Sequence, residues 1–196
     1  AGRVHAANDP ERALQLFGAS EFGTRSTRAC TELIGRGAQM TYAQEDVRRS
    51  VKAGDLTLNY YEAAPEGGVS LVGGGLPLVM LHGGGPGASA WSNFGRALPH
   101  FASTFRTLLI DQPGFGASDK PAVTANYFRF SAEYVLKALD ELGIERIHLL
   151  GNSLGGGTAM RFALEYPDRV GRLVLMGPGG LSLNLFHADP TEASSA

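Results

Sequence analysis

The stretch that decides the fold of this chain is Ile147-His-Leu-Leu-Gly-Asn-Ser-Leu-Gly-Gly-Gly157. Its first four residues form an apolar run of strand length, and the glycines that follow mark a turn. The centre fits Gly-x-Ser-x-Gly, a pattern in which a sharp turn between a strand and a helix exposes a serine hydroxyl. Such a turn needs small neighbours, which explains the glycines at positions 151, 155, 156 and 157. We therefore predict that Ser153 is a nucleophile; the alternative is a serine that caps a helix N-terminus.

Other apolar runs of strand length flank this stretch. They are Leu78–Leu81, Leu108–Ile110 and Leu173–Met176. Helical periodicity lies between them, over Ser131–Leu142, after Leu154 and, more weakly, over Trp91–Phe101. Strands that alternate with helices predict an α/β fold with a mostly parallel, doubly wound sheet whose strands are buried on both faces. Upstream, Leu56, Leu58 and Tyr60 alternate with polar or aromatic residues and predict a half-buried strand.

A second glycine-rich stretch, His82-Gly-Gly-Gly-Pro-Gly87, follows the strand Leu78–Leu81 directly. A phosphate-binding loop would end in Gly-Lys-Ser/Thr, and no such ending follows here. A His-Gly-Gly-Gly loop after a strand is instead typical of an oxyanion hole. We predict that one backbone amide of this loop and the amide of Leu154 form this hole. Two donors are needed because a tetrahedral intermediate carries a full negative charge on oxygen. His82 is predicted to brace the loop and not to act as a base.

Several motifs together resemble one family, the meta-cleavage product hydrolases of the α/β-hydrolase superfamily, which cut carbon–carbon bonds in ring-opened aromatic compounds. The run from Leu149 to Glu192 is most similar to members that act on a diseco-steroid acid of steroid degradation, a lipid catabolic route. The motifs are His82–Gly87, Trp91-Ser-Asn93, Asp111-Gln-Pro-Gly-Phe-Gly116, Gly151–Gly157 and Met176-Gly-Pro-Gly-Gly180.

The resemblance implies a chemistry and a set of site residues. Ser153 attacks the 6-oxo carbon of a 2-hydroxy-6-oxo-dienoate, and the carbon–carbon bond breaks because the departing carbanion is delocalised as a dienolate. Substrate contacts are implied for Gly84, Gly85, Asn93 and Asn152, and the resemblance implies that Gly84 supplies the loop's oxyanion-hole amide beside that of Leu154. No metal or organic cofactor is required. The implied partner is a small dienoate, and a homo-oligomer is expected for the full-length protein.

A serine nucleophile needs a histidine base and an orienting carboxylate, which in this fold follow the serine in the chain. The acids after Ser153 are at positions 165, 168, 189 and 192, and the histidine is His187. None matches the family's catalytic acid or histidine. We therefore expect that the chain is truncated, lacks the lid and last strands, and is inactive by itself. Two rival readings stay open, a carboxylesterase and an inactive binding protein on the same scaffold.

Composition limits the remaining functions. The 196 residues carry a formal net charge of −2, which gives no electrostatic footprint for nucleic acid. No apolar run is long enough to span a membrane, and the single cysteine, Cys30, suits a reducing compartment, so a cytoplasmic protein is expected. Residues 1–39 read as a disordered leader or as sequence upstream of a start at Met40, with a short helix over Pro10–Phe17 as an option. Residues 40–196 are expected to form the N-terminal part of the core.

Overall fold

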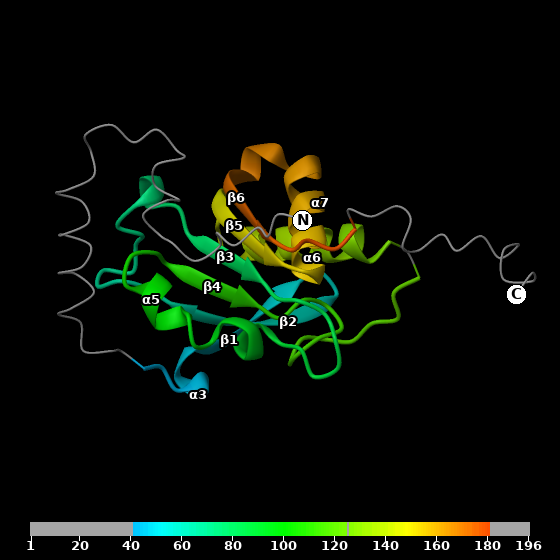
Figure 1. Cartoon of the computed structure of the whole chain (residues 1–196), viewed down its shortest axis with the longest axis horizontal. Helices are drawn as coiled ribbons and strands as arrows, with labels where there is room; N and C mark the ends of the chain where they lie inside the picture. Colours follow the sequence, from blue (N-terminus) through cyan, green and yellow to red (C-terminus); the bar gives the residue numbers. More distant parts are fainter. Residues whose placement is uncertain (1–40, 125, 181–196) are drawn as a thin grey trace, which may run out of the picture. The chain divides into compact units, whose positions relative to one another are not determined.

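The fold is described by a computed structural model that covers residues 41–124 and 126–180 (Figure 1). These residues belong to one of two compact units of the chain, residues 41–196. The expected leader, its helix over 10–17, the start at Met40, and the residues Cys30, His187, Asp189 and Glu192 lie outside the described part.

One sheet of six strands organises the described part. Its strands are β1 (Arg48–Ala53), β2 (Leu56–Ala63), β3 (Leu78–Leu81), β4 (Thr107–Ile110), β5 (Ile147–Asn152) and β6 (Val170–Met176). They lie in the order β1-β2-β4-β3-β5-β6. Strands β4, β3, β5 and β6 are parallel to one another. Strands β1 and β2 form an antiparallel hairpin, and β2 also pairs antiparallel with β4. The mostly parallel sheet predicted from the four apolar runs is confirmed.

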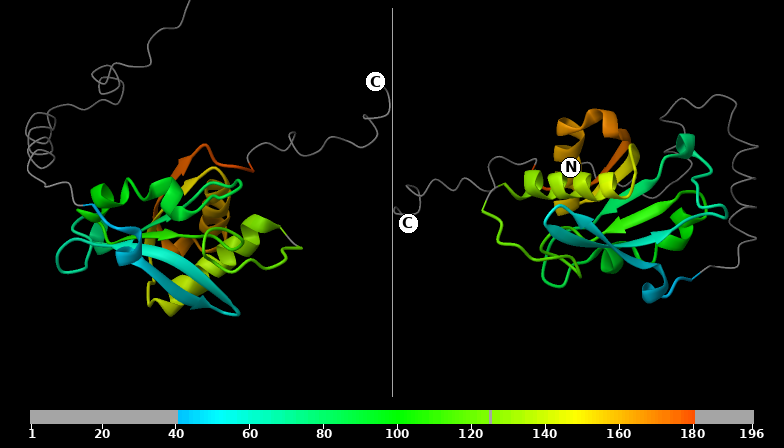
Figure 2. Two further views of the ribbon diagram at one scale, coloured as in Figure 1. Left: turned by 90° about the horizontal axis from the view of Figure 1, so that it is seen from below. Right: turned by 180° about the vertical axis from the view of Figure 1, so that it is seen from behind.

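Helices cover both faces of the sheet (Figure 2). Helices α6 (Tyr127–Glu141) and α7 (Leu154–Glu165) pack Val135 and Phe162 into a core with Leu149 of β5. Helices α4 (Ala90–Phe94) and α5 (Leu98–Ala102) pack against the other face, beside Met80 and Leu109. A short helix α3 (Gln44–Val47) precedes β1, and single 3-10 turns occupy Gly73–Gly75 and Pro167–Arg169. The sheet is therefore doubly wound, as predicted.

Three sequence predictions need correction. The weak helix over Trp91–Phe101 is two short helices, α4 and α5, because the chain turns between Phe94 and Leu98. Helix α6 begins at Tyr127, four residues before the expected start, because the side chain of Asn126 caps it. Strand β2 is not half-buried: Asn59 and Tyr61 are buried too, since α4 and α5 cover the second face. Strand β1 had no prediction.

Strand β6 departs from the expectation that all four parallel strands are buried. Leu173, Val174, Leu175 and Met176 keep between 36% and 50% of their surface exposed. The reason is its place in the sheet: β6 pairs with β5 on one side, and no described strand pairs with its other side. The described part of the sheet thus ends in an apolar edge.

Among the described residues, no helix combines the length and the apolar character that a membrane crossing requires.

Candidate active site

The turn between β5 and α7 places Ser153 at the end of a central strand and at the start of a helix. Its backbone has φ 50° and ψ −112°, the one positive φ of a non-glycine residue in the described part. Such a conformation costs about 1–3 kcal/mol and survives only where the surroundings impose it. The Ser153 N–H donates to the Met176 carbonyl at 2.9 Å, and its carbonyl accepts from Gly157 and Gly179. The side chain makes no helix-capping bond and is exposed, which contradicts the alternative of a capping serine.

Glycines permit this turn through close backbone approach. A Cβ on Gly151 would lie closer than 3.0 Å to the backbone of Gly155 and Gly156. A Cβ on Gly155 would lie equally close to the carbonyls of Leu81 and His82, because α7 begins directly against the end of β3. The Gly155 N–H donates to the His82 carbonyl at 3.0 Å, which joins the start of α7 to the glycine-rich loop.

The loop after β3 lies against the turn that carries Ser153. An added Cβ on Gly84 would be 3.3 Å from the Leu154 side chain, and one on Gly83 would be 3.4 Å from the Ser153 Cβ. Within residues 41–124 and 126–180, the N–H groups of Gly84 and Leu154 donate to no acceptor. The structure thus brings together two unpaired amides and one exposed hydroxyl, the arrangement that an oxyanion hole needs.

Two asparagines border the same place. The Asn93 Oδ1 atom, on α4, accepts hydrogen bonds of 3.0 Å from the Gly83 N–H and from the Asn152 side-chain amide. Both bonds use the Asn93 oxygen, so the Asn93 amide group and the Asn152 oxygen remain without a partner among the described residues. Gly85 follows in the loop with φ 120°. Of the site residues predicted from the sequence, Gly84, Leu154, Asn93 and Asn152 are thus linked to the turn at Ser153, and Gly85 is the next residue of the loop.

His82 lies beneath the loop and is fully buried. Its Nδ1 atom lies 2.7 Å from the Gly83 carbonyl oxygen, and its Nε2 atom accepts the Gln112 N–H at 3.0 Å. Burial lowers the pKa of His82, an effect that the Gly83 bond and the nearby Asp111 carboxylate partly oppose. This placement supports the predicted bracing role.

The buried carboxylate of Asp111 joins three segments around the site. One oxygen accepts from the Ala90 N–H at the start of α4, at 2.6 Å. The other accepts from the Asn59 side chain and from the Ala117 N–H, each at 2.9 Å. Asp111 therefore fixes the helix that carries Asn93 relative to β2 and to the loop after β4.

The described histidines are occupied away from Ser153. His148 Nε2 lies 3.1 Å from the Gly73 carbonyl, and the ring stacks edge-on against Phe105. His100 is exposed on α5 and stacks on Phe101. Of the acids after Ser153, Glu165 pairs with Arg129 and Arg161, while Asp168 lies in the turn beyond α7. None of these groups hydrogen-bonds the Ser153 hydroxyl.

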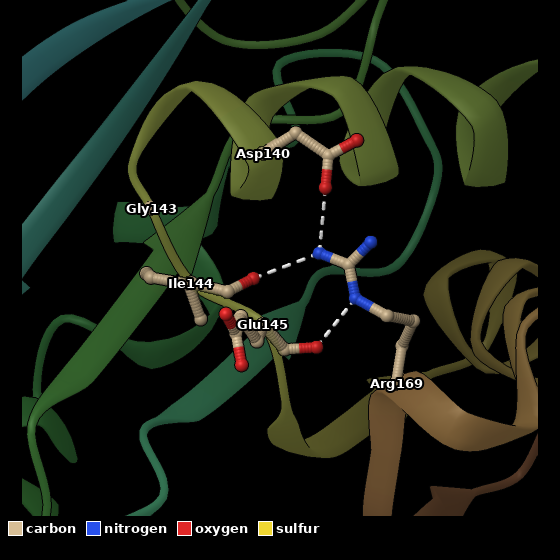
Figure 3. Close-up of a pocket in the computed structure, with 5 residues that line it drawn as sticks. All are labelled: Asp140, Gly143, Ile144, Glu145 and Arg169. Carbon is tan, nitrogen blue, oxygen red and sulfur yellow. Dashed lines mark hydrogen bonds and ion pairs between the residues drawn. The ribbon is translucent and has the colours of Figure 1, made fainter.

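A separate pocket of about 380 Å³ lies between the end of α6 and the turn before β6 (Figure 3). Arg169 lines the pocket, pairs with Asp140 at 2.7 Å and donates to the carbonyls of Ile144 and Glu145. This pocket lies at the amino ends of β5 and β6, whereas Ser153 follows the carboxyl end of β5. Ligands of open α/β sheets bind at the carboxyl ends, so the pocket is not the active site. In the described ranges no cluster of three or more acidic, histidine or cysteine side chains could hold a metal.

From the sequence, Asp111 and Gln112 were quoted only within a family motif, neither of them was assigned a role in the site, and nothing indicated Phe128. The Phe128 ring packs beside Gly157 and Gly180, next to the turn at Ser153. Asp111 and Gln112 follow the apolar run of β4, and polar residues at the end of a parallel strand are a usable signal. Phe128 gave no signal, because its position depends on how α6 packs across α7.

Comparison with known proteins agrees with this geometry. The profile of the family described as the alpha/beta hydrolase fold matches residues 77–194. A 2-hydroxy-6-oxo-6-phenylhexa-2,4-dienoate hydrolase of Burkholderia cepacia is 48% identical over 121 residues, 61% of this chain and 42% of that protein. A 2-hydroxy-6-oxononadienedioate/2-hydroxy-6-oxononatrienedioate hydrolase of Paraburkholderia phymatum is 51% identical over 116 residues, 59% of this chain and 40% of that protein. The chain thus spans less than half the length of these relatives.

Solved structures that are similar to this chain also include hydrolases of this kind. A meta-cleavage product hydrolase from Pseudomonas fluorescens, complexed with acetates, superposes with a TM-score of 0.62 at 31% identity and covers 71% of this chain and 48% of its own. The 2-hydroxy-6-oxo-6-phenylhexa-2,4-dienoate hydrolase of a Rhodococcus species has a TM-score of 0.62 at 30% identity and covers 70% and 48%.

Proposed function

The chain belongs to the α/β-hydrolase fold family, and from this premise we propose that it carries the nucleophile and oxyanion hole of a hydrolase that cleaves a carbon–carbon bond in 2-hydroxy-6-oxo-dienoates. One observation carries the proposal: the strained, exposed Ser153 lies beside the amides of Leu154 and Gly84, which donate to no acceptor among the described residues. The similarity to dienoate hydrolases at about 50% identity supports this choice of substrate.

The Ser153 hydroxyl attacks the 6-oxo carbon of the substrate after the dienol has taken its keto form. The carbonyl oxygen becomes an oxyanion and accepts from the N–H groups of Leu154 and Gly84. The carbon–carbon bond then breaks, its electron pair is delocalised as a dienolate, and the acyl group stays on Ser153 until water releases it. Removing one oxyanion donor costs roughly 10²–10³ in kcat in comparable enzymes, so both amides matter.

Asn93 and Asn152 hold the polar end of the dienoate in this proposal. The free amide of Asn93 donates to a carboxylate or 2-hydroxyl oxygen, and the free oxygen of Asn152 accepts from the hydroxyl. Gly84 and Gly85 expose backbone without side chains and leave room for the substrate chain. Asn93 is fixed by the Gly83 N–H, so substrate binding and oxyanion geometry depend on one side chain.

The substrate's ring system is the finer part of the proposal. The named relatives are hydrolases of a phenylhexadienoate and of a nonadienedioate or nonatrienedioate. The similarity of residues 149–192 to hydrolases of a diseco-steroid acid adds this dienoate as a third candidate. All three candidates present the same 2-hydroxy-6-oxo-dienoate group to Ser153.

A general base is needed to take the Ser153 proton. The three described histidines are engaged elsewhere, and of the described acids after Ser153, Glu165 pairs with arginines and Asp168 lies in the turn beyond α7. We therefore propose that the 196-residue chain supplies the nucleophile and oxyanion hole and turns over little by itself. We also propose a cytoplasmic, homo-oligomeric whole protein that uses no cofactor.

The test is a substrate panel on the protein expressed from its complete coding sequence. The phenyl, nonadienedioate and diseco-steroid dienoates are compared with p-nitrophenyl esters, and the loss of dienoate absorbance is followed with identification of both acid products. The proposal predicts that at least one dienoate has a kcat/KM well above that of every ester. Efficient ester hydrolysis without dienoate cleavage would instead support the carboxylesterase reading.

A further inference from the structure

The two ring nitrogens of His82 are both engaged, and their partners determine where the ring proton lies. The Gln112 backbone N–H points at Nε2 over 3.0 Å, and a backbone N–H can only donate. Nε2 must therefore be the unprotonated acceptor. The Gly83 carbonyl lies 2.7 Å from Nδ1, and a carbonyl can only accept. Nδ1 must therefore carry the proton, which makes His82 a neutral imidazole of the Nδ1–H form.

The bond from His82 Nδ1 to the Gly83 carbonyl also orients the peptide group between Gly83 and Gly84. The Gly83 carbonyl and the Gly84 N–H belong to one planar peptide group, and in a trans peptide they point in opposite directions. No peptide bond in the described residues is cis. By holding the Gly83 oxygen toward the protein interior, His82 turns the Gly84 N–H outward. Glycine itself would not fix this plane, because it has the least restricted backbone of all residues.

We propose that His82 is a positioning residue, which sets the direction of the oxyanion-binding Gly84 N–H through its neutral Nδ1–H form. This inference rests on the proposed function of Gly84. His82 touches neither the substrate nor Ser153 in this role, and it acts through the Gly83–Gly84 peptide. Its Nε2 atom is not available as a base, because the Gln112 N–H occupies it.

The surroundings of His82 form a closed hydrogen-bond network that supports this role. The Ser131 hydroxyl donates to the Gln112 side-chain oxygen at 3.1 Å, which leaves the Gln112 amide to donate to the His82 carbonyl at 2.7 Å. The same carbonyl accepts from Gly155 at the start of α7. His82, Gln112 and Ser131 are all fully buried. His82 therefore contacts the oxyanion loop through its side chain. Through its backbone carbonyl it contacts the helix that supplies Leu154.

Substitutions at His82 separate its two bonds. An asparagine places an amide N–H near the position of Nδ1, whereas a glutamine reaches toward Nε2. Phenylalanine keeps the ring shape and loses both bonds. The proposal predicts that His82→Phe and His82→Gln lower kcat on a dienoate about 100-fold with KM within threefold, as expected for a lost oxyanion donor. We expect His82→Asn to stay within about tenfold of the wild-type kcat.

The control is His148→Phe, which removes the second buried imidazole of the described residues, held at Gly73 away from the site. It should leave kcat unchanged below its melting temperature. Equal losses of kcat in His82→Phe and His82→Asn, or an unchanged kcat in His82→Phe, would overturn the proposal. A loss confined to thermal stability, with wild-type kcat in all folded variants, would also overturn it.

A second measurement needs neither activity nor a folded variant. Nitrogen-15 NMR of the histidine rings in the wild-type protein at pH 7.5 reports which nitrogen carries the proton. The proposal predicts one ring with a protonated Nδ1 and an unprotonated Nε2. An Nε2–H form or an imidazolium at every ring would overturn it. If this signature is present and no dienoate or ester is cleaved by the wild type, the proposed function fails while the assignment of the His82 proton stands.

Discussion

Ser153 keeps its strained backbone conformation because close packing and backbone hydrogen bonds around it impose that conformation. Gly151 and Gly155 let β5, α7 and the end of β3 approach within contact distance, and the Met176 and Gly179 backbones bond the serine itself. The cost of about 1–3 kcal/mol is met by this packing and not by the serine. The sequence pattern predicted the turn from its glycines, whereas the bonds from the end of β6 and from Gly179 depend on tertiary structure.

At Gly155 the contact is with backbone, which cannot move aside. Gly155→Ala would place a methyl closer than 3.0 Å to the carbonyls of Leu81 and His82. We expect a loss of about 2 kcal/mol or more in the free energy of unfolding. Gly143→Ala is the matched control, because its φ is 65° and an added Cβ would meet nothing within 4 Å; its cost should be about 1 kcal/mol. Urea denaturation compares the two, and equal losses would contradict the close approach.

His82 should also make stability depend on pH. Its pKa is lowered in the folded state, mainly by burial, and the facing Asp111 carboxylate only partly opposes this. In the unfolded chain the His82 imidazole takes up a proton as the pH falls through about 6.5. In the folded chain the same imidazole stays neutral to a lower pH. The stabilisation is complete above that pH and is lost as pH falls toward the folded pKa, with a slope approaching about 1.4 kcal/mol per pH unit.

The measurement compares urea denaturation of the wild type and of His82→Asn between pH 7.5 and 5.5. The difference in stability between the two proteins should shift in favour of the variant as pH falls. A difference that is constant over this range would show that His82 does not titrate differently in the folded and unfolded states.

At the scale of elements, the sequence predicted the parallel strands well and the short helices poorly. Strands β3, β4 and β5 are buried apolar runs whose pattern does not depend on distant contacts. The hairpin strand β1 carries Arg48, Arg49 and Lys52, and only Val51 and Ala53 are buried. A six-residue charged edge strand has no distinctive periodicity, so it was missed. The motif resemblance predicted that Asn93 and Asn152 contact the substrate. The hydrogen bond from the Asn152 amide to the Asn93 oxygen could be seen only in the structure.

Helix α4 is five residues long and depends on its cap. Ser89 and Ser92 form a reciprocal capping box, with both bonds at 3.0 Å. Ser89→Ala should lower the free energy of unfolding by about 1 kcal/mol and raise KM for a dienoate, because Asn93 is on this helix. Ser103→Ala, at the exposed end of α5, is the control and should change neither quantity. An unchanged KM in a destabilised Ser89→Ala variant would indicate that substrate binding does not depend on the position of Asn93.

At the scale of the whole molecule, the part of the sheet that the structure describes ends in an apolar edge at β6. Leu173 to Met176 are between 36% and 50% exposed, and an unpaired strand edge offers free N–H and carbonyl groups to another chain. The 196-residue chain, expressed alone, should therefore associate as its concentration rises. Val174→Lys should reduce this association, because a charged side chain on an edge strand disfavours pairing. Sedimentation of both proteins checks this, and a wild-type chain that stays monomeric throughout would contradict it.

The proposed reaction depends on attack by Ser153 on the substrate ketone. Its most direct test is single-turnover absorbance of a dienoate substrate with Ser153→Ala and wild type, each expressed from the complete coding sequence, with Ser103→Ala as the control serine. We predict that Ser153→Ala still binds the dienoate through Asn93 and Asn152 but cleaves it several orders of magnitude more slowly, as for removal of a whole catalytic unit. Retention of more than about a tenth of the wild-type rate, a barrier change below about 1.4 kcal/mol, would mean that another group attacks the ketone.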